Sequence, residues 1–169
     1  LQERSSGGGL DQKTLVTLKK KKDGVELKSR LQGLWALHRT GNLEEKDLVE
    51  LVKDKDEHIR IWALKLMVDN GKASKKSSKA IIEQAVSEKS PLVRLHLASI
   101  MRNLTKQDRW KLAGVLASSS DLKVDPVFPL MVWYGIEELV KSEPAKALQL
   151  AKSSKLLTLT EWIPRRLAE

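Results

Sequence analysis

The chain contains no cysteine among its 169 residues. Disulfides, thiolate metal sites and cysteine nucleophiles are therefore excluded within it, although cysteine content does not decide the cellular compartment. No apolar run approaches the ~18 residues that a membrane-spanning helix needs. The opening residues, LQERSSGGGL, also lack the apolar stretch of a signal peptide and are typical of a helix tail followed by a glycine loop.

Aromatic residues make up only 4% of the chain, and five of the seven are tryptophan. Strand-rich proteins usually depend on Val, Ile, Tyr, Phe and Thr, whereas Leu, Ala, Lys and Glu dominate here and favour helix. The chain is 41% hydrophobic and 31% charged, which is typical of a globular domain rather than a disordered one. We therefore predict a single all-α domain over residues 1–169.

The charge balance is basic, with 31 Lys and Arg against 22 Asp and Glu, for a net charge of +9. A basic balance attracts polyanions, including nucleic acid and anionic lipid head groups. Much of the excess lies in Lys19–Lys22 and in residues 72–79. We interpret these lysine runs as solvated helix ends and loops, which leaves nucleic-acid binding open without favouring it.

An internal repeat organises the sequence. Four similar segments begin at Glu26, Asp56, Ser90 and Asp125. Their starts are 30, 34 and 35 residues apart, within the range of helical-hairpin repeats. Three of these starting residues are good N-caps, and Pro91 and Pro126 follow where the first helical position tolerates proline. Each segment then carries apolar residues at helical spacing, which predicts a helix.

A second helix is predicted after each of these segments. The ranges are 44–53, 77–88, 106–118 and 143–152, with an earlier helix at 10–21 and a last one at about 155–167. Thr105 can cap the helix over 106–118. Gly41 and Gly71 fit the left-handed position that ends a helix. The predicted repeats are therefore roughly 1–22, 26–53, 56–88, 90–118 and 125–152, plus the terminal helix. Because both ends lack partner helices, the chain is expected to be a piece of something longer.

An arginine recurs four residues after three of the segment starts, at Arg30, Arg60 and Arg94. This pattern resembles HEAT repeats, and the resemblance implies a HEAT-like α-solenoid of about five helical hairpins, truncated at both ends. In such stacks these arginines form an inter-repeat ladder with the acid at the helix start, here Asp56 for Arg60. A pair of this kind fixes register more than it adds stability. Ligand contact by the same arginines is the alternative.

The aromatic residues divide into core and surface candidates. Trp35, Trp62 and Trp110 lie among core leucines and are predicted to be buried. Trp133 and Tyr134 are neighbours, so only one can point fully inward, and an exposed aromatic is enriched at binding hot spots. Trp162 is expected to cover the end of the stack or to contact a neighbouring domain. The predicted interaction surface comprises Trp133, Tyr134, Glu137, Arg94 and His38.

No residue pattern predicts a catalytic, cofactor-binding or metal site in this chain. The three histidines, His38, His58 and His96, belong to different repeats, so helix packing or capping is favoured over the convergence that zinc needs. The adjacent acids Glu44–Glu45 and Glu137–Glu138 point about 100° apart on a helix and do not converge for acid–base work. The SSGGG segment lacks the Lys and Ser/Thr of a phosphate-binding loop. An enzyme assembled across repeats stays the least favoured alternative.

The order of several longer motifs resembles one family over nearly the whole chain. The motifs include RLQGLWALHRTG at 30–41, HIRIWALKLMVDNG at 58–71 and, most distinctively, PLMVWYGIEELV at 129–140. They resemble the middle region of the large haem-binding, membrane-bound-dehydrogenase-like proteins of planctomycete and verrucomicrobial type. In that family a sugar-dehydrogenase-type propeller comes first, and a c-type cytochrome segment with a Cys-x-x-Cys-His motif comes last.

The resemblance implies a non-catalytic scaffold or protein-interaction module within a larger redox protein that is periplasmic or otherwise exported. Its partners would be neighbouring domains of the same polypeptide or another protein. Since the chain has no cysteine, haem c would be attached elsewhere in the parent protein, and no cofactor is expected here. The alternative is a basic HEAT-like solenoid that binds nucleic acid.

Overall fold

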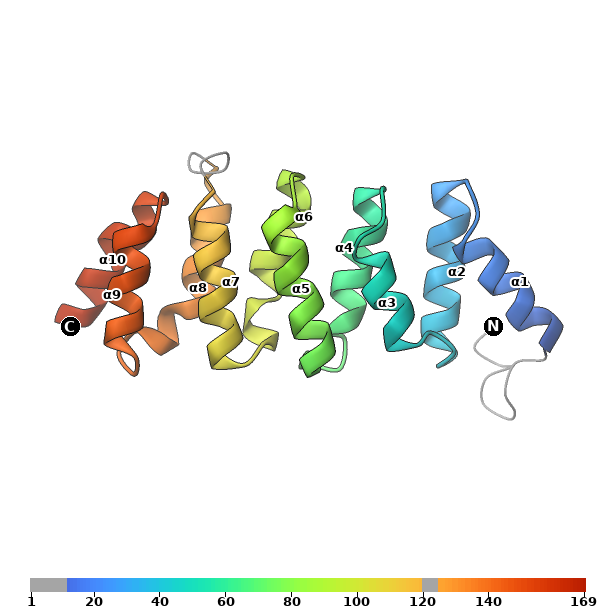
Figure 1. The fold of residues 1–169 in the computed structure, drawn as a ribbon, viewed down its shortest axis with the longest axis horizontal. Helices are drawn as coiled ribbons and strands as arrows, with labels where there is room; N and C mark the ends of the chain where they lie inside the picture. Colours follow the sequence, from blue (N-terminus) through green and yellow to red (C-terminus); the bar gives the residue numbers. More distant parts are fainter. Residues whose placement is uncertain (1–11, 120–124) are drawn as a thin grey trace. The chain divides into compact units, whose positions relative to one another are not determined.

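The computed structural model describes residues 12–119 and 125–169, and within them every regular element is a helix (Figure 1). The all-α class is therefore confirmed. The described helices are α1 (Gln12–Lys22), α2 (Leu27–Arg39), α3 (Glu45–Leu51), α4 (Glu57–Met67), α5 (Lys75–Ser87), α6 (Pro91–Ser99), the 3-10 helix η1 (Met101–Asn103), α7 (Lys106–Ala117), α8 (Phe128–Val140), α9 (Pro144–Ser153) and α10 (Leu157–Ala168). The predicted helix tail and glycine loop at the start of the chain lie outside the described residues.

The chain separates into two compact units, Leu1–Leu66 and Met67–Glu169. In the first unit, α1 packs closely along α2. A Cβ atom placed on Gly33 would lie only 2.5 Å from the backbone nitrogen of Lys22 and 2.9 Å from the carbonyl oxygen of Leu18. The absence of a side chain at Gly33 is therefore what permits this close approach of two helices.

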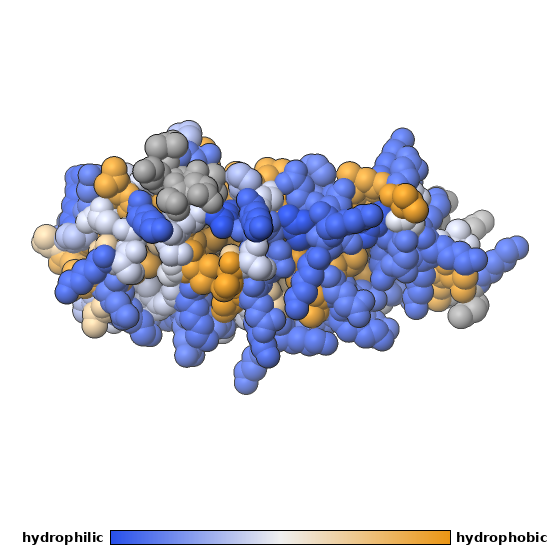
Figure 2. All heavy atoms as spheres, turned by 45° about the horizontal axis from the view of Figure 1, so that its top comes forward, coloured by the Kyte–Doolittle hydropathy of each residue, from blue (hydrophilic) through white to orange (hydrophobic). Residues whose placement is uncertain are grey.

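The second unit is built from two layers of helices. One layer contains α5, α7 and α9, in which α7 contacts both neighbours, and the other contains α6, α8 and α10, in which α8 contacts both neighbours. The layers meet mainly through α7 with α8 and α9 with α10. Fully buried side chains fill the space between them, including Leu97, Leu112, Phe128 and Ile136. On the face of the molecule that Figure 2 shows, hydrophilic side chains surround separate apolar patches.

Several helices begin where the predicted caps stand. The hydroxyl of Ser90 accepts the backbone N–H of Val93 at 3.3 Å, and that of Thr105 accepts the N–H of Asp108 at 3.2 Å. These bonds satisfy backbone donors that have no partner inside the helix. At helix ends, Gly41 and Gly71 have φ of +69° and +84°, which confirms the predicted left-handed positions.

At two helix starts, local side-chain bonds explain a difference from the prediction. The prediction that Pro126 opens a helix is wrong, since α8 begins at Phe128. The carboxylate of Asp125 accepts the N–H groups of Val127 and Phe128 at 2.8 and 2.7 Å, so a tight turn precedes the helix. In the other direction, α5 begins at Lys75 rather than residue 77, because the hydroxyl of Ser74 accepts the N–H of Ser77 at 3.0 Å.

The predicted burial of the tryptophans is correct for one residue and wrong for another. Trp110 is 9% exposed and belongs to the core, whereas Trp35 is 39% exposed. The buried face of α2 contains Leu34 and Leu37, and a residue directly after Leu34 is turned about 100° away from it. Trp35 instead packs edge to face against the partly exposed Trp62, with ring centroids 4.9 Å apart.

Replacing Leu97 by Ala is expected to lower the free energy of unfolding by about 2–5 kcal/mol, because it leaves a cavity in a fully buried site. Leu92 lies on the same helix and is 39% exposed, so Leu92→Ala should cost about 1 kcal/mol at most. Urea denaturation measures both. Equal effects of the two substitutions would contradict the described core.

Gly33→Ala is expected to destabilise the first unit by about 1–3 kcal/mol, because the new methyl group would force α1 away from α2. Gly114 is also inside a helix, but a Cβ atom there would meet nothing within 4 Å. Gly114→Ala should therefore raise stability by about 0.5–1 kcal/mol through its better helix propensity. Thermal denaturation distinguishes these opposite signs, and a neutral Gly33→Ala would exclude the close approach.

Candidate interaction site

The adjacent aromatic residues of α8 face different environments. Trp133 is 6% exposed, while Tyr134 is 52% exposed. Trp133 packs edge to face against Trp162 of α10, with ring centroids 5.7 Å apart and an interplanar angle of 88°. The structure thus identifies Tyr134 as the outward member of the pair.

A shallow groove of about 220 Å³ runs between α8 and α10, beside the buried indole of Trp133. Its lining also includes Trp162, Glu137 and Arg166. Arg166 lies 3.8 Å from the carboxylate of Glu137 and donates a 2.9 Å hydrogen bond to Glu169. That hydrogen bond is the main cause of a lowered pKa at Glu169. The groove therefore combines two indole rings with paired charges.

A second charge cluster surrounds Glu138, the exposed acid that follows Glu137. Its carboxylate accepts hydrogen bonds from Arg109 of α7 and from Arg102 of η1, the latter at 3.1 Å. Arg109 is itself fixed by donating to the backbone carbonyls of Leu104 and Arg102 at 3.2 and 2.7 Å. Hydrogen bonding from Arg109 is the main cause of the lowered pKa of Glu138. This cluster is not predicted from the sequence, since nothing in the linear spacing indicates that the three residues meet.

The recurring arginines share one structural role in the described residues, which is to bind backbone carbonyls that precede their own helices. Arg30 donates to the carbonyl of Lys22 at 3.2 Å and Arg60 to that of Asp54 at 2.8 Å. Arg94 donates to the carbonyl of Glu88 at 2.9 Å, and also to the hydroxyl of Ser119. Each arginine therefore anchors the turn that leads into its helix.

One of these arginines also forms an ion pair with an acid in the link that follows its own predicted repeat. The guanidinium of Arg30, which is 9% exposed, binds both carboxylate oxygens of Asp54 at 3.0 and 2.5 Å. Burial is the largest influence on the pKa of Asp54 and acts to raise it, but hydrogen bonds from Arg30 and from the N–H of Asp56 outweigh burial and lower it. Asp56, the acid singled out from the sequence, accepts the N–H of His58 at 2.9 Å and acts as a helix cap.

The acid of this pair has a counterpart in the next repeat that sequence reasoning could have found. Asp54 and Glu88 each stand two residues before a helix cap, and each accepts the N–H of that cap, at 2.9 and 2.8 Å. Glu88 is 3% exposed and also accepts a 2.8 Å hydrogen bond from Gln84. In both repeats an acid precedes the cap by two residues and an arginine follows the cap by four. This shared spacing is the sequence pattern that indicates these contacts.

The residues of the predicted interaction surface lie in several places. Trp133 and Glu137 line one groove, and Tyr134 stands exposed on the same helix. Arg94 lies on α6, where it binds a backbone carbonyl and a serine. His38 belongs to α2 of the first unit and is partly exposed.

Within residues 12–119 and 125–169, no three histidine or acidic residues gather closely enough to hold a metal ion. None of the helices in these ranges has the length and apolar character to cross a membrane.

Asp54→Asn is expected to lower the free energy of unfolding at neutral pH by about 3 kcal/mol, because it leaves the buried guanidinium of Arg30 without a charge partner. Since the pKa of Asp54 is lowered in the fold, its contribution is present above the unfolded pKa of about 3.9 and is lost as the pH falls through the folded value. Denaturation from pH 7 to pH 2 should therefore show the difference between the two proteins shrinking in acid.

The matched control is Glu50→Gln, which removes an exposed acid from the surface of α3. This substitution should have no measurable effect on stability. A pH-independent loss in Asp54→Asn would show that the pair with Arg30 is not its cause.

Comparison with protein-family models, with curated proteins and with solved structures found no match to this chain.

Proposed function

We propose that this chain is a non-catalytic helical-repeat scaffold that binds protein surfaces, with its hairpins stacked as a HEAT-like α-solenoid. The proposal is supported by the two helical layers of the second unit and by the recurrent arginine contacts before α2, α4 and α6. Repeats of this kind each contact their neighbours and present extended surfaces for binding.

The observation that carries the proposal is the exposure of Tyr134 beside fixed charges. Tyr134 is 52% exposed, and it is followed on α8 by Glu137 and Glu138, which pair with arginines of α10, η1 and α7. Binding hot spots combine a tyrosine or tryptophan anchor with a polar rim that excludes water. Because the charges are held by neighbouring elements, little side-chain freedom would be lost on binding.

The PLMVWYGIEELV motif resembles a block of the haem-binding, dehydrogenase-like family, and this resemblance extends the proposal to a cellular setting. In that setting the chain connects or docks domains of an exported, periplasmic redox protein of the haem-binding, dehydrogenase-like type. Its partners are then neighbouring domains of the same polypeptide, and haem c is attached to one of them. The cysteine-free chain itself contributes no thiolate to such attachment.

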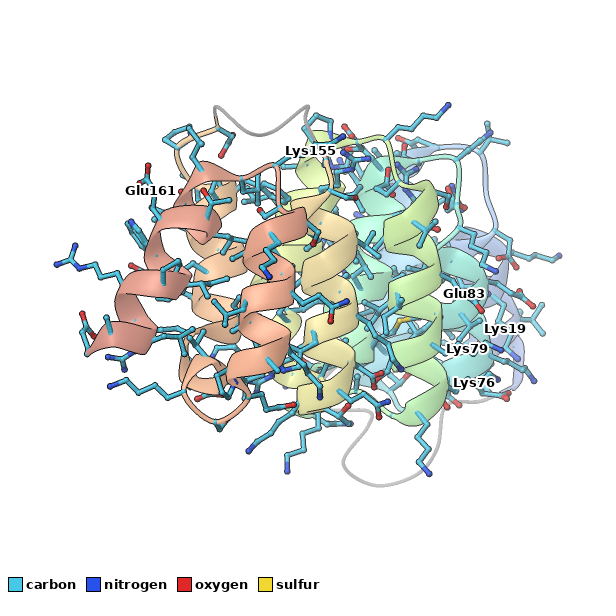
Figure 3. All side chains as sticks on the ribbon, turned by 60° about the vertical axis from the view of Figure 1, so that its left-hand side comes forward. Lys19, Lys76, Lys79, Glu83, Lys155 and Glu161 are labelled. Carbon is cyan, nitrogen blue, oxygen red and sulfur yellow. The ribbon has the colours of Figure 1, made fainter. Side chains whose placement is uncertain are left out.

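Nucleic-acid binding remains the second candidate because exposed lysines gather on α5. Lys75 and Lys79 line a groove of about 490 Å³ between α5 and α7, and Figure 3 shows Lys76 and Lys79 on this helix. Acids are interleaved with these lysines, however, since Lys79 lies 3.8 Å from Glu83. This interleaving weakens the continuous positive track that a phosphate backbone needs.

The scaffold proposal is tested by titrating the chain with the separately produced regions that flank it in the parent polypeptide. Isothermal titration calorimetry should detect binding to at least one of them. Tyr134→Ala should raise the Kd about tenfold or more, as expected of a hot-spot residue. Leu148→Ala removes a 43% exposed apolar residue from α9 in the other layer and should leave the Kd within about twofold.

Failure of both flanking regions to bind would overturn the proposal. The nucleic-acid candidate is measured in parallel with duplex DNA at about 50 and 200 mM salt. Tight binding that falls steeply with salt would favour that candidate instead, and its absence would remove it.

A further inference from the structure

A groove of about 420 Å³ lies between α1 and α2 of the first unit. Leu18, Trp35 and Ala36 contribute its apolar lining, and Lys21 and Arg39 line it as well. Trp35 is 39% exposed, so a large part of its indole remains in contact with water. A groove of this size accepts one or two side chains of a partner.

The groove continues into an outward stripe of α2. Lys28, Gln32, Trp35 and Arg39 follow one another at intervals of four, three and four residues, and all four are exposed. This spacing places them on one face of the helix. The stripe therefore presents a single aromatic ring between basic side chains.

The neighbouring helix α4 extends this surface with Trp62 and Lys65. The rings of Trp35 and Trp62 pack edge to face at 4.9 Å, and the ammonium group of Lys65 lies 5.1 Å from the centre of the Trp62 ring. Such contacts fix the orientation of both indoles. The aromatic pair is thus preorganised, which lowers the entropy lost on binding.

The positive charge of this surface is not balanced by acids. Neither the groove lining nor the stripe of α2 contains an acidic residue. Within the described part of the chain, Lys21, Lys28 and Arg39 form no ion pair. The groove between α5 and α7 differs in this respect, because its lysines lie beside acids. Lys79 lies 3.8 Å from Glu83 (Figure 3), and Lys111 lies 3.0 Å from Asp108.

We infer that the α1–α2 groove docks an acidic amphipathic helix of a partner protein. An apolar side chain of the partner would enter beside Leu18 and Trp35, while carboxylates one turn away would face Lys21 and Arg39. This is the helix-in-groove mode of recognition, in which apolar anchors supply affinity and charges supply specificity. The inference deepens the proposed scaffold function, and rests on it, by naming the chemistry of one partner.

A nucleic acid fits this surface less well than an acidic helix does. Single strands are held by a cationic track along the phosphates together with successive stacking platforms. Here the groove lining holds two cations beside the apolar Leu18 and Ala36, and the contact with Trp62 occupies part of the Trp35 indole. An aliphatic or aromatic side chain makes better use of this lining.

The test uses the whole chain and a labelled synthetic helix about four turns long, with Leu at positions i, i+3, i+4 and i+7 and Glu elsewhere. Fluorescence anisotropy should give a Kd below about 1 mM. Trp35→Ala and Arg39→Glu should each raise that Kd about tenfold. Added salt should weaken binding, because the charges are exposed.

Two controls define the site. Leu157→Ala, at a 72% exposed residue of α10, should leave the Kd unchanged. A peptide with Gln in place of Glu should bind at least about tenfold more weakly. Circular dichroism checks the fold of each variant, and Arg39→Glu carries the test if Trp35→Ala unfolds, because the Arg39 side chain is exposed.

Several outcomes would overturn the inference: no binding of the acidic peptide, binding insensitive to Trp35→Ala and Arg39→Glu, or tighter binding of a single-stranded oligonucleotide. The separate titration with flanking regions distinguishes this failure from that of the scaffold proposal. If those regions bind through Tyr134 and the acidic peptide does not bind, only the docking inference falls. If neither binds, both fall.

Discussion

The burial of apolar stripes between neighbouring helices is the constraint on which the rest of this structure depends. The described α-helices have between seven and thirteen residues. Helices of this length are marginal or unstable alone in water, so each needs a neighbour to cover its apolar face. Leu64, Leu97 and Ile136 are fully buried in this way. Once those faces are committed to packing, the outward positions become available for binding.

Polar contacts then fix the backbone just before α2, α4 and α6. Arg30, Arg60 and Arg94 bind carbonyls that precede their helices, and Asp54 and Glu88 bind the N–H groups of the following caps. These bonds satisfy backbone groups that would otherwise be left unpaired near the core. The hydrophobic effect is not directional, so these hydrogen bonds orient the start of each helix. The close approach at Gly33 plays a comparable part for α1 and α2.

The repeat also explains where the two candidate surfaces occur. Trp35 and Tyr134 each lie nine residues after the start of an aligned segment, and the equivalent positions hold Lys65 and Ser99. All four side chains are exposed. A position that packing leaves outward in every repeat can vary in chemistry without disturbing the core. Different repeats could thus bind different partners on one architecture.

Sequence patterns alone predict the helical class, the caps at Ser90 and Thr105, and the turns at Gly41 and Gly71. These features depend on residues within a few positions of one another, where spacing and backbone chemistry suffice. The packing of the helices, in contrast, establishes that Tyr134 and not Trp133 faces outward, that Trp35 is exposed, and that Arg30 meets Asp54. Those outcomes depend on which distant helix covers each side chain, and no local pattern specifies that partner.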